Sequence, residues 1–216
     1  MNIRMDNNVS WYIEKQIDRI INNLRKRNME GFFVSDNSEL ISLLEKLIAE
    51  NSVIGVGDSM TLFETGVIDF IRKGSYIFLD KYKRGITSEE KKQIYIQNFS
   101  ADTFLCSTNA ITESGELYNI DGNGSRVAPM LYGPKQVILV AGINKIVKDI
   151  EEAEKRVRNY SAPIDAKRLD KDTPCVNLGY CIDCKSPNRI CNDFLVIRGQ
   201  FIKNRIKVII VGKQLG

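Results

Sequence analysis

Twelve residues in the first third of the chain, Val53–Glu64 (VIGVGDSMTLFE), constrain the fold most. The apolar start of this stretch is typical of a short buried strand, and Gly55 and Gly57 allow the backbone to turn sharply. Ser59, or the aspartate before it, then suits the cap of a helix that begins near Met60. The stretch therefore predicts a strand, a tight loop and a helix N-terminus.

This turn has two interpretations. Free N–H groups of the first helical turn, together with the hydroxyls of Ser59 and Thr61, would suit a phosphate or a carboxylate. Glu64, one turn further on, would then be a candidate general base. In the alternative, the segment is an ordinary capped turn, and Glu64 lies favourably near the positive end of the helix dipole.

The rest of the chain alternates between helical and strand patterns. This alternation predicts an α/β fold with an open, mostly parallel sheet flanked by helices. Strands are expected at 31–35, 53–56, 76–79, 103–106, 117–120, 136–141, 194–197 and 206–211. Helices are expected at 9–28, 37–50, 60–73, 88–99, 126–131 and 144–158.

A second polar stretch lies in Ala101–Ala128. A loop containing Asn109, Glu113 and Gly115 follows a predicted buried strand. It has many hydrogen-bonding groups, which are costly to bury without partners. The later turn DGNGS, with Gly124, opens another set of N–H groups next to the cation Arg126. Ligands collect at the carboxyl ends of strands in open parallel sheets, so both turns are expected to face one crevice.

Four of the five cysteines lie close together near the C-terminus, with the spacing C-x5-C-x2-C-x6-C. Such clustering suits a tetrahedral zinc ion or a cubane iron–sulphur cluster, and the spacing does not decide between them. Unligated or redox-active thiols are the alternative. The candidate ligands are Cys175, Cys181, Cys184 and Cys191.

Composition removes several classes of function. The chain has 216 residues, is 43% hydrophobic and contains no histidine, which excludes the usual Ser-His-Asp and Cys-His catalysts. Its net charge of +4 is spread along the sequence, so a nucleic-acid surface is not expected. No apolar run suits a membrane helix and no signal peptide is visible, so we expect a cytoplasmic protein. We expect one domain over 1–216, with an N-terminal helix within 1–30 and a Cys-rich loop at 172–193.

Three strings carry a family resemblance: GVGDSMTLFETG, ADTFLCSTNAITESGELYN and GNGSRVAPMLYGPKQVILVAGINKIV. In this order they resemble the LUD (lactate utilisation) domain family. That family belongs to the superfamily of ribose-5-phosphate isomerase, glucosamine-6-phosphate deaminase and CoA transferases (NagB/RpiA/CoA transferase-like). The string NLGYCIDCKSPNRICN resembles the C-terminal part of a subset of the family.

The resemblance implies a Rossmann-like sheet, and oxidation of L-lactate in complexes with iron–sulphur subunits. It also implies that Glu113 takes part in chemistry. The implied crevice is lined by Gly55, Gly57, Ser59, Thr61, Asn109, Glu113, Gly115, Gly124 and Arg126.

The leading hypothesis is a protein that binds a small anionic, phosphate-bearing or CoA-bearing metabolite, in electron transfer related to L-lactate oxidation. Glu113 or Glu64 would act as acid or base, and Arg126 would stabilise negative charge. One alternative is a non-catalytic redox-sensing or scaffold module that uses the cysteine segment. Another is a sugar-phosphate isomerase or an acyl/CoA transferase-like enzyme. Expected partners are iron–sulphur proteins and, through the N-terminal helix, a second copy of the chain.

Overall fold

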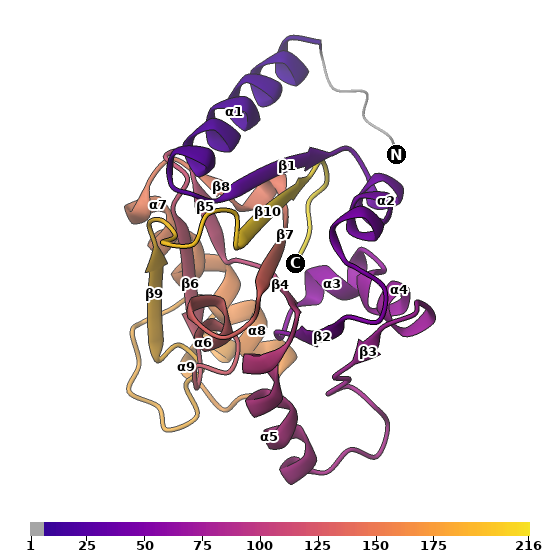
Figure 1. Ribbon diagram of the computed structural model, residues 1–216. Coiled ribbons are helices and arrows are strands. Elements are labelled where there is room, and N and C mark those ends of the chain that lie inside the picture. The colour runs from indigo at the N-terminus through magenta and orange to yellow at the C-terminus, as the bar shows by residue number, and fades with distance from the viewer. Residues whose placement is uncertain (1–6) are drawn as a thin grey trace.

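A six-stranded parallel sheet forms the centre of the computed structural model, which describes residues 7–216 (Figure 1). Parallel neighbours require crossover connections, and the intervening helices provide them. The α/β class with a mostly parallel sheet flanked by helices is therefore confirmed. In sheet order, the strands are β1 (Glu30–Val34), β10 (Ile206–Val211), β7 (Gln136–Gly142), β4 (Thr103–Cys106), β2 (Val53–Val56) and β3 (Ile77–Phe78).

A second, four-stranded sheet was not predicted. It contains β8 (Ile146–Val147), β5 (Ala110–Thr112), β6 (Leu117–Asp121) and β9 (Asp193–Ile197), in that order. The β5–β6 and β6–β9 pairs are antiparallel, whereas β5–β8 is parallel. The polar loop predicted around β5 and the helix predicted over β8 are both wrong. Strands this short carry too few residues for alternation to show.

Nine α-helices are present in the described part of the chain. They are α1 (Asn7–Lys26), α2 (Asn37–Leu47), α3 (Met60–Glu64), α4 (Val67–Lys73), α5 (Ser88–Gln97), α6 (Val127–Leu131), α7 (Ile150–Arg156), α8 (Ala162–Arg168) and α9 (Pro174–Leu178). The helix predicted at 60–73 is divided at Gly66, whose φ of 76° is left-handed. The first six residues of the predicted N-terminal segment lie outside the described residues. The remaining helical turns are η1 (Asn98–Ser100) and η2 (Ile143–Lys145), both 3-10, and the π turn η3 (Val157–Ser161).

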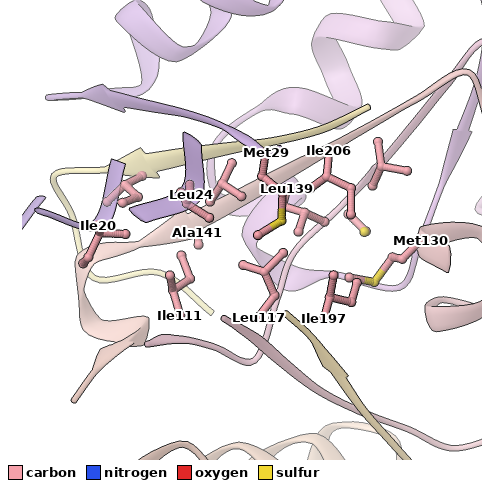
Figure 2. Close-up of a cluster of buried hydrophobic side chains, with 14 of the residues drawn as sticks. Ile20, Leu24, Met29, Ile111, Leu117, Met130, Leu139, Ala141, Ile197 and Ile206 are labelled. Atoms are coloured by element: carbon pink, nitrogen blue, oxygen red, sulfur yellow. The ribbon is translucent and has the colours of Figure 1, made fainter. Parts of the chain in front are cut away.

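Both faces of the parallel sheet are buried, as is usual when helices cross over both sides. Leu139 and Ala141 of β7 point to one cluster, while Ile138 and Val140 point to the other. The first cluster fills the space between the sheet, α1 and the second sheet. Figure 2 shows Leu24 of α1 at one side of that cluster. The second cluster packs α2, α3 and α4 against the opposite face.

A third, smaller cluster joins the second sheet to the helices that follow β8. Ala153 of α7 and Val157 of the π turn pack with Tyr118 and Ile120 of β6. This packing holds α7, the π turn and α8 in place beside the carboxyl ends of the central strands. No helix within residues 7–216 is long and apolar enough to cross a membrane.

Candidate functional site

A cavity of about 460 Å³ lies at the carboxyl ends of β2, β4 and β7. This volume suits a small metabolite, and the location is where open parallel sheets bind ligands. We call it the ligand cavity. Its walls come from the β2–α3 turn, the β4–β5 loop, the start of α6, η2, the π turn and α8. The lining residues are Asp58, Ser59, Met60, Thr61, Glu64, Ser107, Thr108, Asn109, Arg126, Lys145, Tyr160, Ser161, Ile164, Asp165, Lys167, Arg168 and Gly216.

Gly55 of β2 and Gly57 of the β2–α3 turn shape the cavity without lining it, although the sequence placed both in the crevice lining. A Cβ at Gly57 would lie 2.8 Å from both Arg126 Cγ and Cys106 Cβ, so only glycine lets these groups approach. A Cβ at Gly55 would lie 2.3 Å from Asn98 Oδ1. The glycines therefore allow β2 and its turn to pack tightly beside β4, which brings the polar residues after the turn to the cavity wall.

Ser59 is the first of those polar residues. It occupies the N-cap position of α3, yet its side chain makes no capping hydrogen bond. Its Oγ is buried without a hydrogen-bond partner among the described residues. A buried hydroxyl costs free energy unless it is hydrogen-bonded, so this group is available to a molecule in the cavity.

Lys145 provides the least expected feature of the wall. Its Nζ donates hydrogen bonds to Thr61 Oγ1 and to Ser107 Oγ, each at 3.0 Å. Only 7% of the residue is exposed. Both bonding partners are neutral hydroxyls, so neither neutralises a charge on the amine.

This environment disfavours the charged form of the amine. Burial is the largest of the effects that lower the pKa of Lys145 from 10.5 to about 8, and the positive charges of Arg156 and Arg126 act in the same direction. Asp165 and Glu64 act in the opposite direction. A substantial fraction of Lys145 is therefore uncharged in mildly alkaline solution.

Arg126 holds the cavity wall together. Its Nη1 donates to Ser107 O and Asn119 Oδ1, and its Nη2 donates to Asn109 Oδ1 and Ile120 O, at 2.7–3.0 Å. These acceptors use the terminal N–H groups, so Arg126 contributes positive potential to the cavity while tying the β4–β5 loop to β6. Direct ligand binding through this guanidinium, as the sequence suggested, would require one of these bonds to break.

The acidic residues of the wall already have partners. Asp58 pairs with the buried Lys81 at 2.9 Å, and Asp165 pairs with Arg168 at 2.9 Å. Glu64 is exposed, and its Oε2 accepts a hydrogen bond from Gly216 N at 2.8 Å. The structure therefore places Glu64 at the cavity, where an acid–base role stays a prediction.

Glu113 and Gly115 do not reach the ligand cavity, and their expected place in the crevice is wrong. Glu113 accepts a hydrogen bond from Gln16 Nε2 at 2.8 Å and pairs with Arg19 at 3.5 Å. Gly115, with φ of 84°, closes the β5–β6 hairpin against α1. The polar groups of this loop form hydrogen bonds within a tight hairpin and to α1. The sequence alone did not reveal these partners.

The N–H groups at the DGNGS turn, which were expected to bind a ligand, are hydrogen-bonded by a side chain of the same turn. Asp121 Oδ2 accepts hydrogen bonds from Arg126 N at 2.9 Å and Val127 N at 3.1 Å. Gly124, with φ of 76°, shapes this turn but does not line the cavity. The crevice prediction is thus wrong for this turn, because its own carboxylate uses the N–H groups.

The sequence model of the LUD domain family matches residues 17–211. The chain belongs to the LUD domain family. The comparison with curated proteins found no match.

Two solved structures show similarity at low identity. One is a DUF162 family protein from Deinococcus radiodurans, with 15% identity, a TM-score of 0.48 and coverage of 94% of this chain and 98% of that one. The other is ribose 5-phosphate isomerase A from Methanocaldococcus jannaschii, with 18% identity and a TM-score of 0.34. This second match covers 54% of the present chain and 56% of that protein.

Several cavity residues of this LUD domain were not predicted from the sequence. Lys145 was assigned to the first turn of a helix at 144–158, but it ends η2 and points its amine into the wall. The α8 residues were missed because no helix was expected beyond 158. A π turn leads directly into α8, and such turns are frequent at functional sites. The mixture of Lys, Arg and Asp after the π turn was the available signal.

The cysteine segment of the LUD domain surrounds a second, smaller cavity on the other side of α8. Cys175 lies in α9, and the other three cysteines follow in irregular structure. The cavity has a volume of about 10 Å³ and is lined by Ala162, Ala166, Thr173, Cys175, Cys181, Ile182, Cys184, Arg189, Ile190 and Cys191. We call it the thiol cavity. Within residues 7–216, no three His, Cys, Asp or Glu side chains are arranged as a metal-ligand set. The four thiols therefore gather round the void without forming one.

Proposed function

We propose that this LUD domain binds a small carboxylate- or phosphate-bearing metabolite in the ligand cavity. The observation that carries the proposal is the buried amine of Lys145, which has hydroxyl partners and lies beside the further positive charges of Arg126 and Arg156. An anionic ligand would neutralise positive charge that the wall itself leaves uncompensated. The unpartnered hydroxyl of Ser59 supplies an additional donor.

The family resemblance supports a link between this binding and oxidation of L-lactate. In that case iron–sulphur partner proteins would carry the electrons, and the LUD domain would hold the metabolite. If acid–base chemistry takes place in the cavity, Glu64 is the carboxylate positioned for it. A sugar-phosphate isomerase or a CoA transferase-like enzyme would use the same cavity with a different ligand.

Thermal-shift measurements test the proposal directly. The probes are L-lactate, ribose 5-phosphate, CoA and inorganic phosphate, because a ligand that binds only the native state raises Tm. We expect at least one probe to raise the Tm of the wild type and to lose its effect in Lys145→Met. Lys203→Met, an exposed lysine between β9 and β10, should respond like the wild type. No shift with any probe, or an equal shift in Lys145→Met, would contradict the proposal.

A second proposal concerns the thiol cavity. Four cysteine side chains line one void of about 10 Å³, which is close to the space that one water molecule occupies. This size favours a single ion over a cubane cluster, so we propose that Cys175, Cys181, Cys184 and Cys191 bind zinc after a small adjustment of the loop. Burial raises the pKa of Cys191, so binding must displace a proton from this thiol.

Metal analysis after anaerobic purification distinguishes the candidates. One zinc per chain and a colourless protein would support the zinc site, and Cys184→Ser should then lose the zinc. The matched control is Lys185→Met, the exposed neighbour. A brown protein with acid-labile sulphide would show that the cysteines bind an iron–sulphur cluster instead of zinc. A protein with neither would favour the redox-sensing alternative.

A further inference from the structure

We propose that Lys145 is a nucleophilic amine that forms an imine with a small 2-oxo acid bound in the ligand cavity. The inference depends on the proposed function, because the same cavity must first bind the acid. It adds a covalent step, and a chemical class of ligand, to a site that otherwise only holds an anion.

The hydrogen bonds of Lys145 favour attack on a carbonyl carbon. An uncharged amine has two N–H donors and one lone pair. Its two partners, Thr61 Oγ1 and Ser107 Oγ, lie on α3 and after β4, and both are buried. When both N–H groups are donated to these oxygens, the lone pair stays free. The amine is thus held at the wall of a metabolite-sized cavity by two elements of the central fold.

The charges around Lys145 favour the uncharged form that such an attack requires. Arg126 at the start of α6 and Arg156 of α7 lower its pKa, in addition to burial, and Glu64 of α3 and Asp165 of α8 raise it. The result is a pKa of about 8. Desolvated lysines and lysines beside other cations are the ones that serve as Schiff-base nucleophiles.

The same surroundings favour a carboxylate next to the carbonyl group. Arg126 and Arg156 place two buried or half-buried positive charges near the amine. Lys167 adds a third at the exposed rim of the cavity. When Lys145 is uncharged, these cations remain to attract the carboxylate. The Ser59 hydroxyl, which has no partner among the described residues, is a donor for the acid. A compound with adjacent carbonyl and carboxylate groups uses both features at once.

The reaction balances without an added oxidant or reductant. The lone pair of Nζ attacks the carbonyl carbon as the C=O π bond opens, and one of the two Nζ protons passes to the carbonyl oxygen to give a neutral carbinolamine. The hydroxyl then leaves as water with the second Nζ proton, and the nitrogen lone pair forms the C=N bond. Amine and oxo acid thus give imine and water, and hydrolysis reverses the step.

Borohydride trapping followed by mass spectrometry tests this proposal. The full-length protein is incubated with pyruvate or glyoxylate at pH 8, reduced, digested and mapped. We expect one reduced adduct per chain, located at Lys145. At this pH about half of Lys145 is uncharged, against less than about 1% of an ordinary lysine, so labelling should exceed that of other lysines by about a hundredfold. Lys203→Met should label like the wild type.

Lys145→Arg separates this proposal from the proposed function. Arginine keeps the positive charge but cannot act as the amine, so the adduct should disappear while any Tm shift with L-lactate, which has no keto group, persists. An absent adduct, or labelling spread over the surface lysines, overturns the imine. If L-lactate still raises Tm in that case, anion binding stands; if no anion raises Tm, both proposals fail.

Discussion

The amine of Lys145 loses hydration on folding, and both of its hydrogen-bond partners are hydroxyl groups. Its pKa falls from 10.5 in the exposed state to about 8 in the fold. Between these values the unfolded chain binds more protons than the folded one, so this residue makes stability rise with pH. Below pH 8 both states hold the proton, and the cost of burying the charge is fully present.

Comparison with Lys145→Met isolates this effect. The wild-type free energy of unfolding, minus that of the variant, should increase by at most about 1 kcal/mol per pH unit between about pH 8 and 10. Cys106 and Tyr82, whose pKa values burial raises, are present in both proteins and cancel in the difference. Urea denaturation at a series of pH values measures it. A difference that does not change with pH would show that Lys145 is more hydrated than its burial indicates.

Gly57 gives a second prediction at the level of a single residue. A Cβ there would lie 2.8 Å from Arg126 Cγ and Cys106 Cβ, so Gly57→Ala should destabilise the protein by about 1–3 kcal/mol through overpacking. Gly85→Ala is the control, because Gly85 has φ of 80° and open space around it, and left-handed strain alone costs roughly 1–2 kcal/mol. Only Gly57→Ala should also alter ligand binding, since only it displaces the cavity wall. Thermal-shift measurements give the loss of stability from the Tm of each variant alone. They give the change in binding from the Tm shift caused by the probe that raises the Tm of the wild type.

The same glycine shows what sequence patterns can and cannot specify about a residue. The strand, the turn after Gly57 and the helix near Met60 were predicted correctly, because glycine and N-cap preferences are local. The partners of polar side chains are not local. Glu113 appeared available for chemistry, yet it pairs with Arg19, which is far away in sequence.

At the level of whole elements, the strands with continuous apolar runs were all located, whereas the elements that were missed are β5, β8, α8 and α9. The β7 run QVILVAG is unambiguous. By contrast, β5 has three residues and its neighbours are polar. Pro163 lies in the first turn of α8, where a proline is tolerated, but a proline within a helical pattern normally ends or kinks the helix. The π turn that leads into α8 has no signature that a periodicity analysis detects.

Arg126 connects three of these elements, so its removal should affect more than one of them. It bonds Ser107 O after β4, Asn109 Oδ1 before β5, and Asn119 Oδ1 and Ile120 O within β6. Arg126→Met should remove all four bonds, and among these acceptors Asn109 Oδ1 keeps another donor, Ile120 N at 3.0 Å. The variant should therefore be destabilised by about 2–4 kcal/mol. Arg158→Met, which removes partly exposed pairs with Glu154 and Asp183, should cost less than about 1 kcal/mol. Chemical denaturation of both variants checks the contrast, and equal losses would contradict the assigned role of Arg126.

On the scale of the whole molecule, one short helix separates the two cavities. Asp165 and Arg168 of α8 face the ligand cavity, while Ala162 and Ala166 line the thiol cavity. Because the helix is packed on both sides, a change in the thiol segment is transmitted to the ligand cavity only if α8 moves or loosens. The thiol segment therefore has a structural route to the ligand cavity, whether its thiols bind zinc or respond to redox state.

The double variant Cys181→Ser, Cys184→Ser tests this coupling. Replacing two half-buried thiols removes contacts that hold the loop against Ala162 and Ala166, so amide hydrogen exchange in α8 should become faster. The Tm shift produced by the probe that stabilises the wild type should become smaller at the same time, since α8 forms one wall of the ligand cavity. Exchange in β7 and β10, at the centre of the parallel sheet, should stay unchanged. Lys185→Met, in the same loop, controls for a general effect of substitution there. If α8 exchanges faster while the ligand-induced Tm shift is unchanged, the two cavities are independent.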